Sequence, residues 1–151
     1  MGEPSSITEP SRPAPGTILG ERYLIERLIN EGGMGAIYGA RDLLRDQPVA
    51  VKLILAPRYT SAETERFERE ARLLRELSHP SIVSFIADGQ TAAGMRYLVM
   101  EWLVGEDLAS RLKRGPLTIA ESILLMRRIC DGLAVAHDRG VIHRDLKPAE
   151  I

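Results

Sequence analysis

The sequence is poor in cysteine and has no long apolar run. Its 151 residues include a single cysteine, Cys130, so no disulfide can form within the chain. No stretch approaches the roughly 18 consecutive apolar residues of a membrane-spanning helix. We therefore expect a cytoplasmic protein. Cys130 falls in an apolar helical pattern, so we expect a small buried core residue there and not a reactive thiol.

Neither sign of charge is in excess. Twenty Lys and Arg residues are balanced by 21 Asp and Glu residues, and only 5% of the residues are aromatic. The net charge of −1 gives no overall field to attract nucleic acid or an anionic membrane, and no basic patch alternates with aromatic residues. The composition is ordinary for a globular protein, and we expect no nucleic-acid partner.

The first 16 residues differ in composition from the rest. They hold four prolines, three serines and almost no large apolar side chain. Such a segment cannot bury enough apolar surface to offset the entropy lost on ordering. We therefore predict a disordered leader over residues 1–16, with ordered structure beginning near Thr17.

Alternating and β-branched apolar patterns after the leader predict strands. The glycine-rich stretch EGGMG at 31–35 separates two of these patterns and predicts a hairpin. The turn GQTAAG at 89–94 separates another two. The strands are predicted over residues 22–30, 36–42, 49–55, 81–88 and 95–103.

Helix-starting signals occur twice. Thr60 with Glu63 and Thr118 with Glu121 fit the T-x-x-E capping box, and Gly140 is placed to end the second helix. The helices are predicted over residues 60–78, 107–113 and 118–139. Together these elements predict an α+β fold: a five-stranded antiparallel sheet with one helix, followed by a helical region.

Four local features point to phosphate chemistry when they occur together. The segment NEGGMGAIY at 30–38 places glycines between two strands, where backbone N–H groups can approach a phosphate; a tight hairpin turn alone would also explain it. Lys52 ends an apolar strand and needs an anionic partner if it is desolvated, although it could also reach solvent. Glu70 borders the apolar face of the next helix or is an ordinary surface carboxylate.

The fourth feature is HRDLKP at 143–148. Asp145 and Lys147 are two residues apart and can point to one side of an extended loop. The carboxylate could accept a proton from a substrate hydroxyl, and the ammonium could stabilise charge on a transferred phosphoryl group.

From Arg22 to Ile151 the sequence resembles the front half of a bacterial-type serine/threonine protein kinase. Gly32, Gly35 and Ile37 match the second glycine, third glycine and valine of the family's G-x-G-x-x-G-x-V loop, with Asn30 in place of the first glycine. The resemblance implies an N-lobe and hinge over 17–103 and an incomplete helical C-lobe over 104–151.

The resemblance also implies a set of roles. Lys52 would hold the α- and β-phosphates of ATP and pair with Glu70, Asp145 would be the catalytic carboxylate, and Lys147 would contact the γ-phosphate. A protein Ser/Thr hydroxyl would be the acceptor. The implied ATP-binding residues are Ile29, Asn30, Gly32, Gly33, Gly35, Ile37, Ala50, Lys52, Met100, Glu101, Leu103 and Asp107.

Two departures from the family pattern bear on activity. Glu150 stands where the family has an asparagine ligand for Mg²⁺; its carboxylate is a possible magnesium ligand or simply a divergent residue. No D-F-G segment or activation loop follows in the 151 residues. We therefore expect a kinase truncated in its catalytic loop, inactive alone, with apolar residues of the helix at 118–139 exposed.

Two alternative functions remain open on the sequence. A non-catalytic pseudokinase fragment could bind nucleotide or pair with another kinase lobe. A small-molecule kinase on the same fold is disfavoured by HRDLKP and by the helix that carries Glu70.

Overall fold

The computed structural model describes residues 12–32, 35–54 and 72–151, so the expected helix start at Thr60 and Glu63 and the candidate residues Gly33 and Glu70 lie outside the described residues. The described residues group into two units, which we treat separately. Unit 1 contains residues 12–32, 35–54 and 85–102, and unit 2 contains residues 72–84 and 103–151. The lobe boundaries expected from the sequence, 17–103 and 104–151, stay a prediction. The two structural units differ from these lobes, because residues 72–84 group with residues 103–151 in unit 2.

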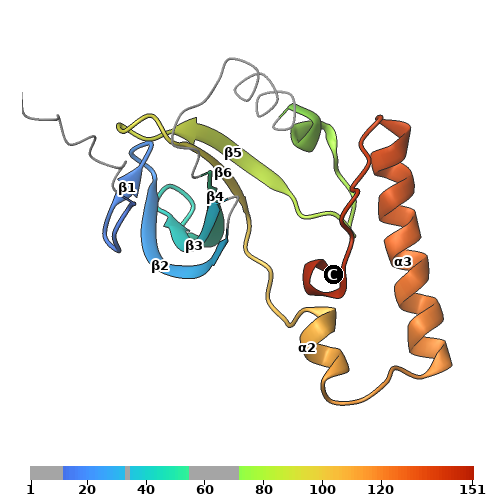
Figure 1. Cartoon of the computed structure of the whole chain (residues 1–151). Coiled ribbons are helices and arrows are strands. Elements are labelled where there is room, and N and C mark those ends of the chain that lie inside the picture. Colours follow the sequence, from blue (N-terminus) through green and yellow to red (C-terminus); the bar gives the residue numbers. More distant parts are fainter. Residues whose placement is uncertain (1–11, 33–34, 55–71) are drawn as a thin grey trace, which may run out of the picture. The chain divides into compact units, whose positions relative to one another are not determined.

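Unit 1 is an antiparallel sheet in the strand order β1-β2-β3-β4-β6-β5 (Figure 1). It confirms the expected antiparallel sheet and the hairpin at the glycine-rich turn, but the sheet has six strands and not five. The extra strand is β1, which is only two residues long and pairs with the start of β2. The strands are β1 (Ile18–Leu19), β2 (Tyr23–Gly32), β3 (Gly35–Asp42), β4 (Gln47–Leu53), β5 (Phe85–Gln90) and β6 (Arg96–Glu101).

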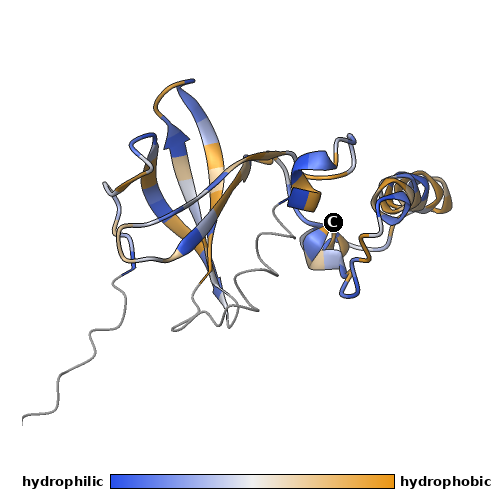
Figure 2. Cartoon of the chain, turned by 90° about the horizontal axis from the view of Figure 1, so that it is seen from above, coloured by the Kyte–Doolittle hydropathy of each residue, from blue (hydrophilic) through white to orange (hydrophobic). Residues whose placement is uncertain are grey.

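One face of this sheet carries the hydrophobic core. Because strand side chains alternate between the two faces, every second residue of β4 is buried: Val49, Val51 and Leu53 are at most 2% exposed. Figure 2 shows the corresponding apolar stretches along the strands. The core comprises Leu19, Tyr23, Ile25, Ala36, Tyr38, Ala40, Val49, Val51, Leu53, Met95, Tyr97 and Val99.

The segment before β1 is bonded to the sheet, which corrects our expectation that order begins near Thr17. The backbone N–H of Gly16 donates to the Ile25 carbonyl at 2.8 Å, and the Ile25 N–H donates to the Thr17 carbonyl at 2.8 Å. Arg12 forms an ion pair with Glu31 of β2 at 2.6 Å. Backbone groups can bond to a neighbouring strand whatever the side-chain composition, so the proline-rich sequence did not reveal this contact.

Strand β5 begins at Phe85, four residues later than the predicted strand over 81–88. The N–H of Ser81 donates to His79 Nδ1 at 3.1 Å, and the N–H of Ile82 donates to the His79 carbonyl at 2.9 Å. These bonds hold residues 79–82 in a turn, so their amides are not available to a sheet. At its other end β5 continues through Gly89 and Gln90, which we had assigned to the turn; Gly89 pairs with Tyr97, and a Cβ there would collide with the tyrosine ring.

Unit 2 contains the two helices α2 (Leu108–Leu112) and α3 (Ile119–Asp138) and the 3₁₀ turn η1 (Pro148–Glu150). Both helices were predicted. Residues 72–76 are also helical and end before Pro80, as expected. The capping box of α3 is present in full: Thr118 Oγ1 accepts from the Glu121 N–H at 3.2 Å, and Glu121 Oε2 accepts from the Thr118 N–H at 2.7 Å. Gly140, with φ of 73°, follows the helix end as predicted.

Much of the apolar surface of α3 is exposed. Ile119 is 81% exposed and Ile123 is 65% exposed, which confirms the expected exposure of apolar residues of this helix. Cys130 is also exposed, so our prediction of a buried core cysteine is wrong. Helical periodicity identifies an apolar face but does not supply the partner that would bury it. No helix among the described residues is long and apolar enough to cross a membrane.

Candidate active site

The strand register gathers several candidate residues on the face of the sheet opposite the core, which we call the outer face. In antiparallel pairs, directly opposed residues share a face. Ile37 is opposite Lys52, and Ala50 is opposite both Gly39 and Met100. Lys52 is exposed between the buried residues of β4, so its side chain is on the outer face. The structure therefore brings Ile37, Ala50, Lys52 and Met100 together, as expected for a shared site.

Lys52 is placed to bind an anion. Among the described residues it has no ion-pair partner, and Glu70, its expected partner, lies outside them. Such an ammonium beside three apolar residues, Ile37, Ala50 and Met100, suits a ligand that is both apolar and anionic. This combination is typical of nucleotide sites, in which a few charged groups orient a ligand held by apolar contacts.

The glycine-rich turn has a structural requirement of its own. Gly32 is opposite Gly35 at the described ends of β2 and β3. Gly35 has φ of 149°, and a Cβ there would collide with the carbonyl oxygen of Leu53 in β4. Asn30, at the position of the family's first glycine, accepts a hydrogen bond from the Glu31 N–H at 2.8 Å through its own Oδ1. The side-chain amide oxygen of Asn30 therefore binds the backbone of the next residue at the start of the turn.

The three candidate residues near the end of β6 are divided between the units. Glu101 is the last residue of β6 in unit 1, whereas Leu103 and Asp107 belong to unit 2. Leu103 is 67% exposed. Asp107 caps α2: its carboxylate accepts from the Ser110 N–H at 2.8 Å and from Ser110 Oγ at 2.9 Å, and these bonds lower the pKa of Asp107. A role for Asp107 in binding ATP stays a prediction.

The HRDLKP segment forms a compact charged cluster in unit 2. Lys147 Nζ lies 2.8 Å from Asp145 Oδ2 and 3.3 Å from Glu150 Oε1, so one ammonium bridges two carboxylates. Its hydrogen bond to Asp145 lowers the pKa of that carboxyl, and hydrogen bonds to Asp145 and then Glu150 raise the pKa of Lys147. Next to Asp145, Arg144 has a left-handed φ of 65°, a conformation that is costly for a non-glycine residue and clusters at functional sites.

The described residues hold no cluster of three or more metal-ligand side chains. No group of three or more His, Cys, Asp or Glu side chains among residues 12–32, 35–54 and 72–151 is arranged to hold a metal ion. The Glu150 carboxylate is directed instead to the Lys147 ammonium, and His143 Nε2 is 3.8 Å from its other oxygen. A role for Glu150 as a magnesium ligand stays a prediction.

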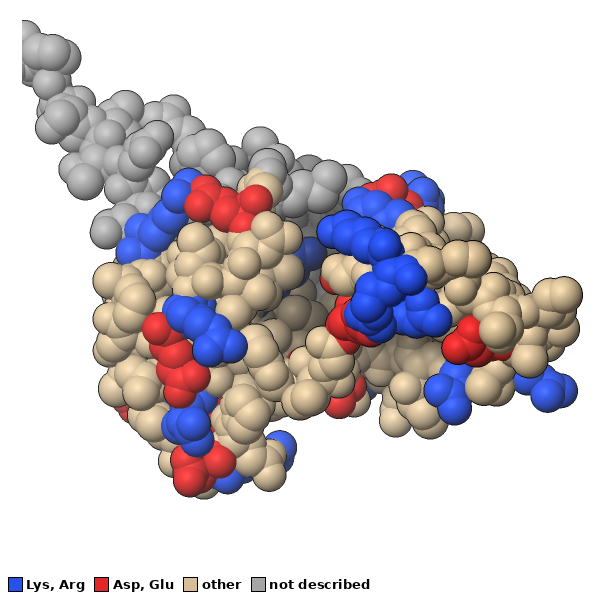
Figure 3. Space-filling view, turned by 90° about the horizontal axis from the view of Figure 1, so that it is seen from below, with Lys and Arg blue, Asp and Glu red and all other residues tan. Residues whose placement is uncertain are grey.

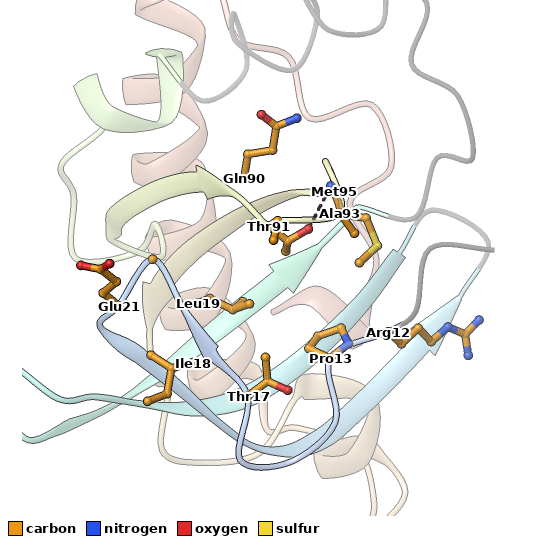
Figure 4. Close-up of a pocket in the computed structure, with 12 residues that line it drawn as sticks. Arg12, Pro13, Thr17, Ile18, Leu19, Glu21, Gln90, Thr91, Ala93 and Met95 are labelled. Atoms are coloured by element: carbon orange, nitrogen blue, oxygen red, sulfur yellow. Dashed lines mark hydrogen bonds between the residues drawn. The ribbon is translucent and has the colours of Figure 1, made fainter. Parts of the chain in front are cut away.

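A cavity of about 440 Å³ lies in unit 1 away from these candidates (Figure 4). It is lined by the β1 region and by the turn between β5 and β6, where the Met95 N–H donates to Thr91 Oγ1 at 3.0 Å. None of the residues that we predicted for the site lines it. On the surface, basic and acidic side chains are adjacent on both units (Figure 3).

Sequence reasoning missed three residues of the outer face: Arg27, Gly39 and Trp102. A Cβ on Gly39 would lie 3.4 Å from Trp102 Cζ3 and 3.5 Å from Arg27 Cγ. The Arg27 guanidinium lies over the Trp102 ring, 5.6 Å from its centroid. The alternation of side chains along β6 could have placed Trp102 on the outer face. Trp102 is two residues after Met100, and residues two apart in an extended chain share a face.

Three features resemble those of a protein kinase: the outer face suited to a phosphate ligand, the aspartate–lysine pair, and the antiparallel sheet followed by helices. Comparison with known proteins agrees with this resemblance. The chain belongs to the protein kinase domain family, whose match covers residues 23–151. The match confirms the family and fold class indicated by the glycine-rich turn and HRDLKP.

Its relatives are bacterial serine/threonine kinases. The chain is 38% identical over 141 residues to the serine/threonine-protein kinase pkn3 of Myxococcus xanthus, covering 90% of this chain and 25% of pkn3. It is 40% identical over 131 residues to PknH of Mycobacterium tuberculosis, covering 85% of this chain and 21% of PknH. The crystal structure of the M. tuberculosis PknI kinase domain superposes with a TM-score of 0.78 at 25% identity, covering 91% of this chain and 56% of that one.

Proposed function

We propose that this chain is the nucleotide-binding part of a serine/threonine protein kinase domain. The outer face of the sheet would contact the adenine through Ile29, Ile37, Ala50 and Met100, and Lys52 would bind the α- and β-phosphates. The observation that carries the proposal is the strand register, which gathers the Lys52 ammonium and three apolar candidates on one face although they come from β3, β4 and β6. Membership of the kinase family supports ATP as the ligand.

The charged cluster of unit 2 supports a catalytic role for Asp145. With its pKa lowered by Lys147, the Asp145 carboxyl is ionised at neutral pH and able to accept a hydrogen bond from a Ser or Thr hydroxyl. Lys147 would then move from Asp145 or Glu150 to the γ-phosphate. ATP is used with Mg²⁺ throughout this family, where the ion neutralises phosphate charge, but we assign no step to it because no cluster of three or more metal-ligand side chains lies among the described residues.

We propose further that the 151-residue chain binds ATP without transferring its phosphoryl group at a measurable rate. The lack of a metal-ligand group among the described residues supports this view, since phosphoryl transfer depends on positioning and charge stabilisation. A second candidate function, pairing with another kinase lobe, is favoured by the exposed apolar residues of α3.

The test is equilibrium dialysis of labelled ATP against the purified chain and two variants. Lys52→Ala removes a charge-assisted contact to phosphate, so we expect binding to weaken by about ten-fold or more. Lys113→Ala removes a lysine at the end of α2 and leaves the outer face intact, so its affinity should match that of the unchanged chain. Far-UV circular dichroism checks that all three are folded.

The outcomes separate the parts of the proposal. Equal ATP affinity in the Lys52→Ala variant would contradict the assigned site, and absence of binding in the unchanged chain would contradict the function. Transfer of labelled phosphate to a mixed Ser/Thr peptide library by the chain alone would contradict its inactivity. A sedimentation experiment that finds a stable dimer without ATP binding would favour the pairing function.

A further inference from the structure

The segment before β1 is attached to β2 at two places, and the first is a turn. The Thr17 N–H donates to the Ala14 carbonyl at 3.0 Å, and Gly16 has φ of 92°. Proline followed by a glycine with positive φ, as in Pro15 and Gly16, is typical of a type II turn. The Gly16 N–H also donates to the Ile25 carbonyl at 2.8 Å, so the turn is fixed to the first half of β2.

The second attachment lies near the other end of β2. Arg12 Nη2 is 2.6 Å from Glu31 Oε1, one residue before Gly32. Strand β1 pairs with β2 only at Tyr23 and Leu24, so the later part of β2 has a neighbouring strand, β3, on one side alone. The Arg12 ion pair therefore joins the segment before β1 to the part of β2 that leads into the glycine-rich turn.

That part of β2 is irregular. Its pairing register with β3 shifts between Ile25 and Arg27 and again between Leu28 and Asn30. Such shifts disrupt the ladder locally and bend the strand. A strand with two irregularities and a partner on one side is held less firmly at its end than a central, regular strand. A contact at Glu31 therefore helps to determine where the glycine-rich turn lies.

The ion pair is on the core side of the sheet. Glu31 is opposite Ala36, which is completely buried in the core, whereas Asn30 is opposite Ile37 of the outer face. Because directly opposed residues share a face, the Glu31 carboxylate lies on the side away from the candidate nucleotide site. Arg12 thus contacts the end of β2 from behind and leaves the outer face open to a ligand.

The pair also compensates a charge. Glu31 is the only charged residue between Asn30 and Tyr38, and an uncompensated carboxylate beside the glycine-rich turn would repel phosphate. The two charges act in opposite directions on Tyr38: burial raises the pKa of Tyr38, the Arg12 charge lowers it and the Glu31 charge raises it. Arg12 therefore offsets the negative charge of Glu31 in this part of the sheet.

We propose that Arg12 is a positioning residue of the nucleotide site: by pairing with Glu31 it holds the glycine-rich turn in place, offsets the negative charge there and so raises the affinity for the phosphates of ATP. This inference rests on the proposed function, since it concerns the same ligand. It adds a role for the segment before β1, which none of the roles assigned above includes. Arg12 acts through Glu31 and does not contact the nucleotide.

The test is equilibrium dialysis of labelled ATP and of labelled adenosine against the full 151-residue chain and its variants. The side chains of Arg12 and Glu31 are 56% and 35% exposed, so Arg12→Ala should weaken ATP binding by about two- to five-fold, the effect of a surface ion pair. Adenosine, which has no phosphate, should bind equally well. Arg12→Lys should restore most of the ATP affinity. The difference should vanish in about 1 M salt, which screens exposed charges.

A double-mutant cycle tests whether Arg12 acts through Glu31. In a chain that already carries Glu31→Ala, the change Arg12→Ala should have no further effect on ATP affinity, because the partner is absent. Amide hydrogen exchange of the ligand-free chain should be faster at Glu31 and Gly32 in Arg12→Ala than in the unchanged chain, and Arg12→Lys should restore the slower exchange.

The matched control is Arg41→Ala. Arg41 pairs with Glu26 of the same strand at 3.2 Å, and these side chains are 42% and 39% exposed. It also pairs with Asp46 at 3.0 Å. The variant removes one positive charge and an exposed ion pair from β2, but at a position away from the glycine-rich turn. Its ATP affinity should match that of the unchanged chain.

Each contrary result has a distinct meaning. If the unchanged chain binds ATP and Arg12→Ala binds it equally well, the inference is overturned and the proposed function stands. If Arg12→Ala weakens ATP and adenosine equally, or weakens ATP as much when Glu31 is already alanine, Arg12 does not act on the phosphates through Glu31 and the inference is overturned. If dialysis shows no ATP binding to the unchanged chain, the inference and the proposed function both fail.

Discussion

The two units of the chain bury their apolar residues to very different extents. In unit 1, Ile25, Val51, Leu53 and Val99 are completely buried in a core formed by strands from distant parts of the sequence. In unit 2, the 20-residue helix α3 has one buried residue, Gly132. The sheet therefore owes its stability to an extended packed core, whereas α3 has its buried contact at Gly132, next to Ser81 and Ile82, together with a local cap at Thr118. Equivalent mutations in the two units should have unequal effects.

The largest difference is expected for truncation of isoleucine. Ile25→Ala leaves a cavity in the core of unit 1 and should lower the free energy of unfolding by about 2–5 kcal/mol. Ile123→Ala, at a 65% exposed position of α3, should change it by no more than about 0.5 kcal/mol. Urea denaturation followed by Trp102 emission and by circular dichroism gives both values. Similar losses in the two variants would mean that α3 is packed against a partner in solution.

A buried ion pair should give the next largest effect. Asp42 is 1% exposed and accepts from Arg22 Nε at 2.7 Å and from the Leu44 N–H at 3.0 Å. Asp42→Asn removes the carboxylate charge of this partly buried pair and should destabilise unit 1 by about 1–3 kcal/mol, because the Arg22 guanidinium, whose side chain is 29% exposed, loses its partner. The matched control is Asp46→Asn. Asp46 pairs with Arg41 at 3.0 Å but is 86% exposed, so its loss should cost about 0.5 kcal/mol or less.

The Asp42 pair should also make stability depend on pH. The hydrogen bond from Arg22 lowers the pKa of Asp42 from 3.8 to about 2, despite the opposing effect of burial. The folded state thus binds the proton less readily than the unfolded state. The stabilisation is complete above the unfolded pKa of 3.8 and is lost as the pH falls toward 2. Denaturation curves of the unchanged chain and of Asp42→Asn should converge over this interval; a constant difference would exclude Asp42 as the titrating group.

A smaller loss is expected at the start of α3. Thr118→Ala removes the hydroxyl that accepts from the Glu121 N–H and should destabilise the helix by about 1 kcal/mol. Thr118→Ser keeps an accepting hydroxyl and is the control. Amide hydrogen exchange should speed up in the first turn of α3 in the alanine variant and leave β2 to β4 unchanged. Faster exchange in the sheet as well would mean that the two units unfold together.

The smallest effect concerns the charged cluster around Lys147. Asp145→Asn should lower the pKa of Lys147 more than Glu150→Gln does, because Asp145 makes the shorter contact and is the larger cause of the raised value. NMR titration of the lysine side chain measures both changes. The reverse order would show that Glu150 is the main partner of Lys147, and equal pKa values in all three chains would exclude the bridge in solution.

Local sequence signals predicted local structure well. The capping box of Thr118 and Glu121, the helix-ending Gly140 and the hairpin around the glycine-rich turn are each determined by residues a few positions apart, and each is present. The apolar pattern at 49–55 likewise predicted the strand β4 that carries Lys52. The kinase family itself could be predicted from HRDLKP together with the features before it.

Features that depend on distant contacts could not be predicted. Cys130 lies in an apolar pattern, but its burial depends on a neighbour that the pattern cannot identify. Residues 81–84 were predicted to begin a strand, yet the amides of Ser81 and Ile82 bond to His79 in a turn. A Cβ placed on Gly132 of α3 would lie 3.2 Å from the Ser81 side chain. The contact between the Arg27 guanidinium and the Trp102 ring could not be predicted either, because it depends on the order and register of the four strands β2, β3, β4 and β6.

Gly35 determines how mutations in the glycine-rich turn are to be understood. A side chain there would collide with the β4 backbone at Leu53, the residue next to Lys52, whether or not a nucleotide is present. A Gly35 variant that loses ATP affinity would therefore report a displaced strand as much as a lost phosphate contact. A Cβ on Gly32 would meet no atom within 4 Å, and the φ of Gly32 is outside the left-handed region. A change in ATP affinity in Gly32→Ala would therefore report on the phosphate contact alone, which a Gly35 substitution cannot do.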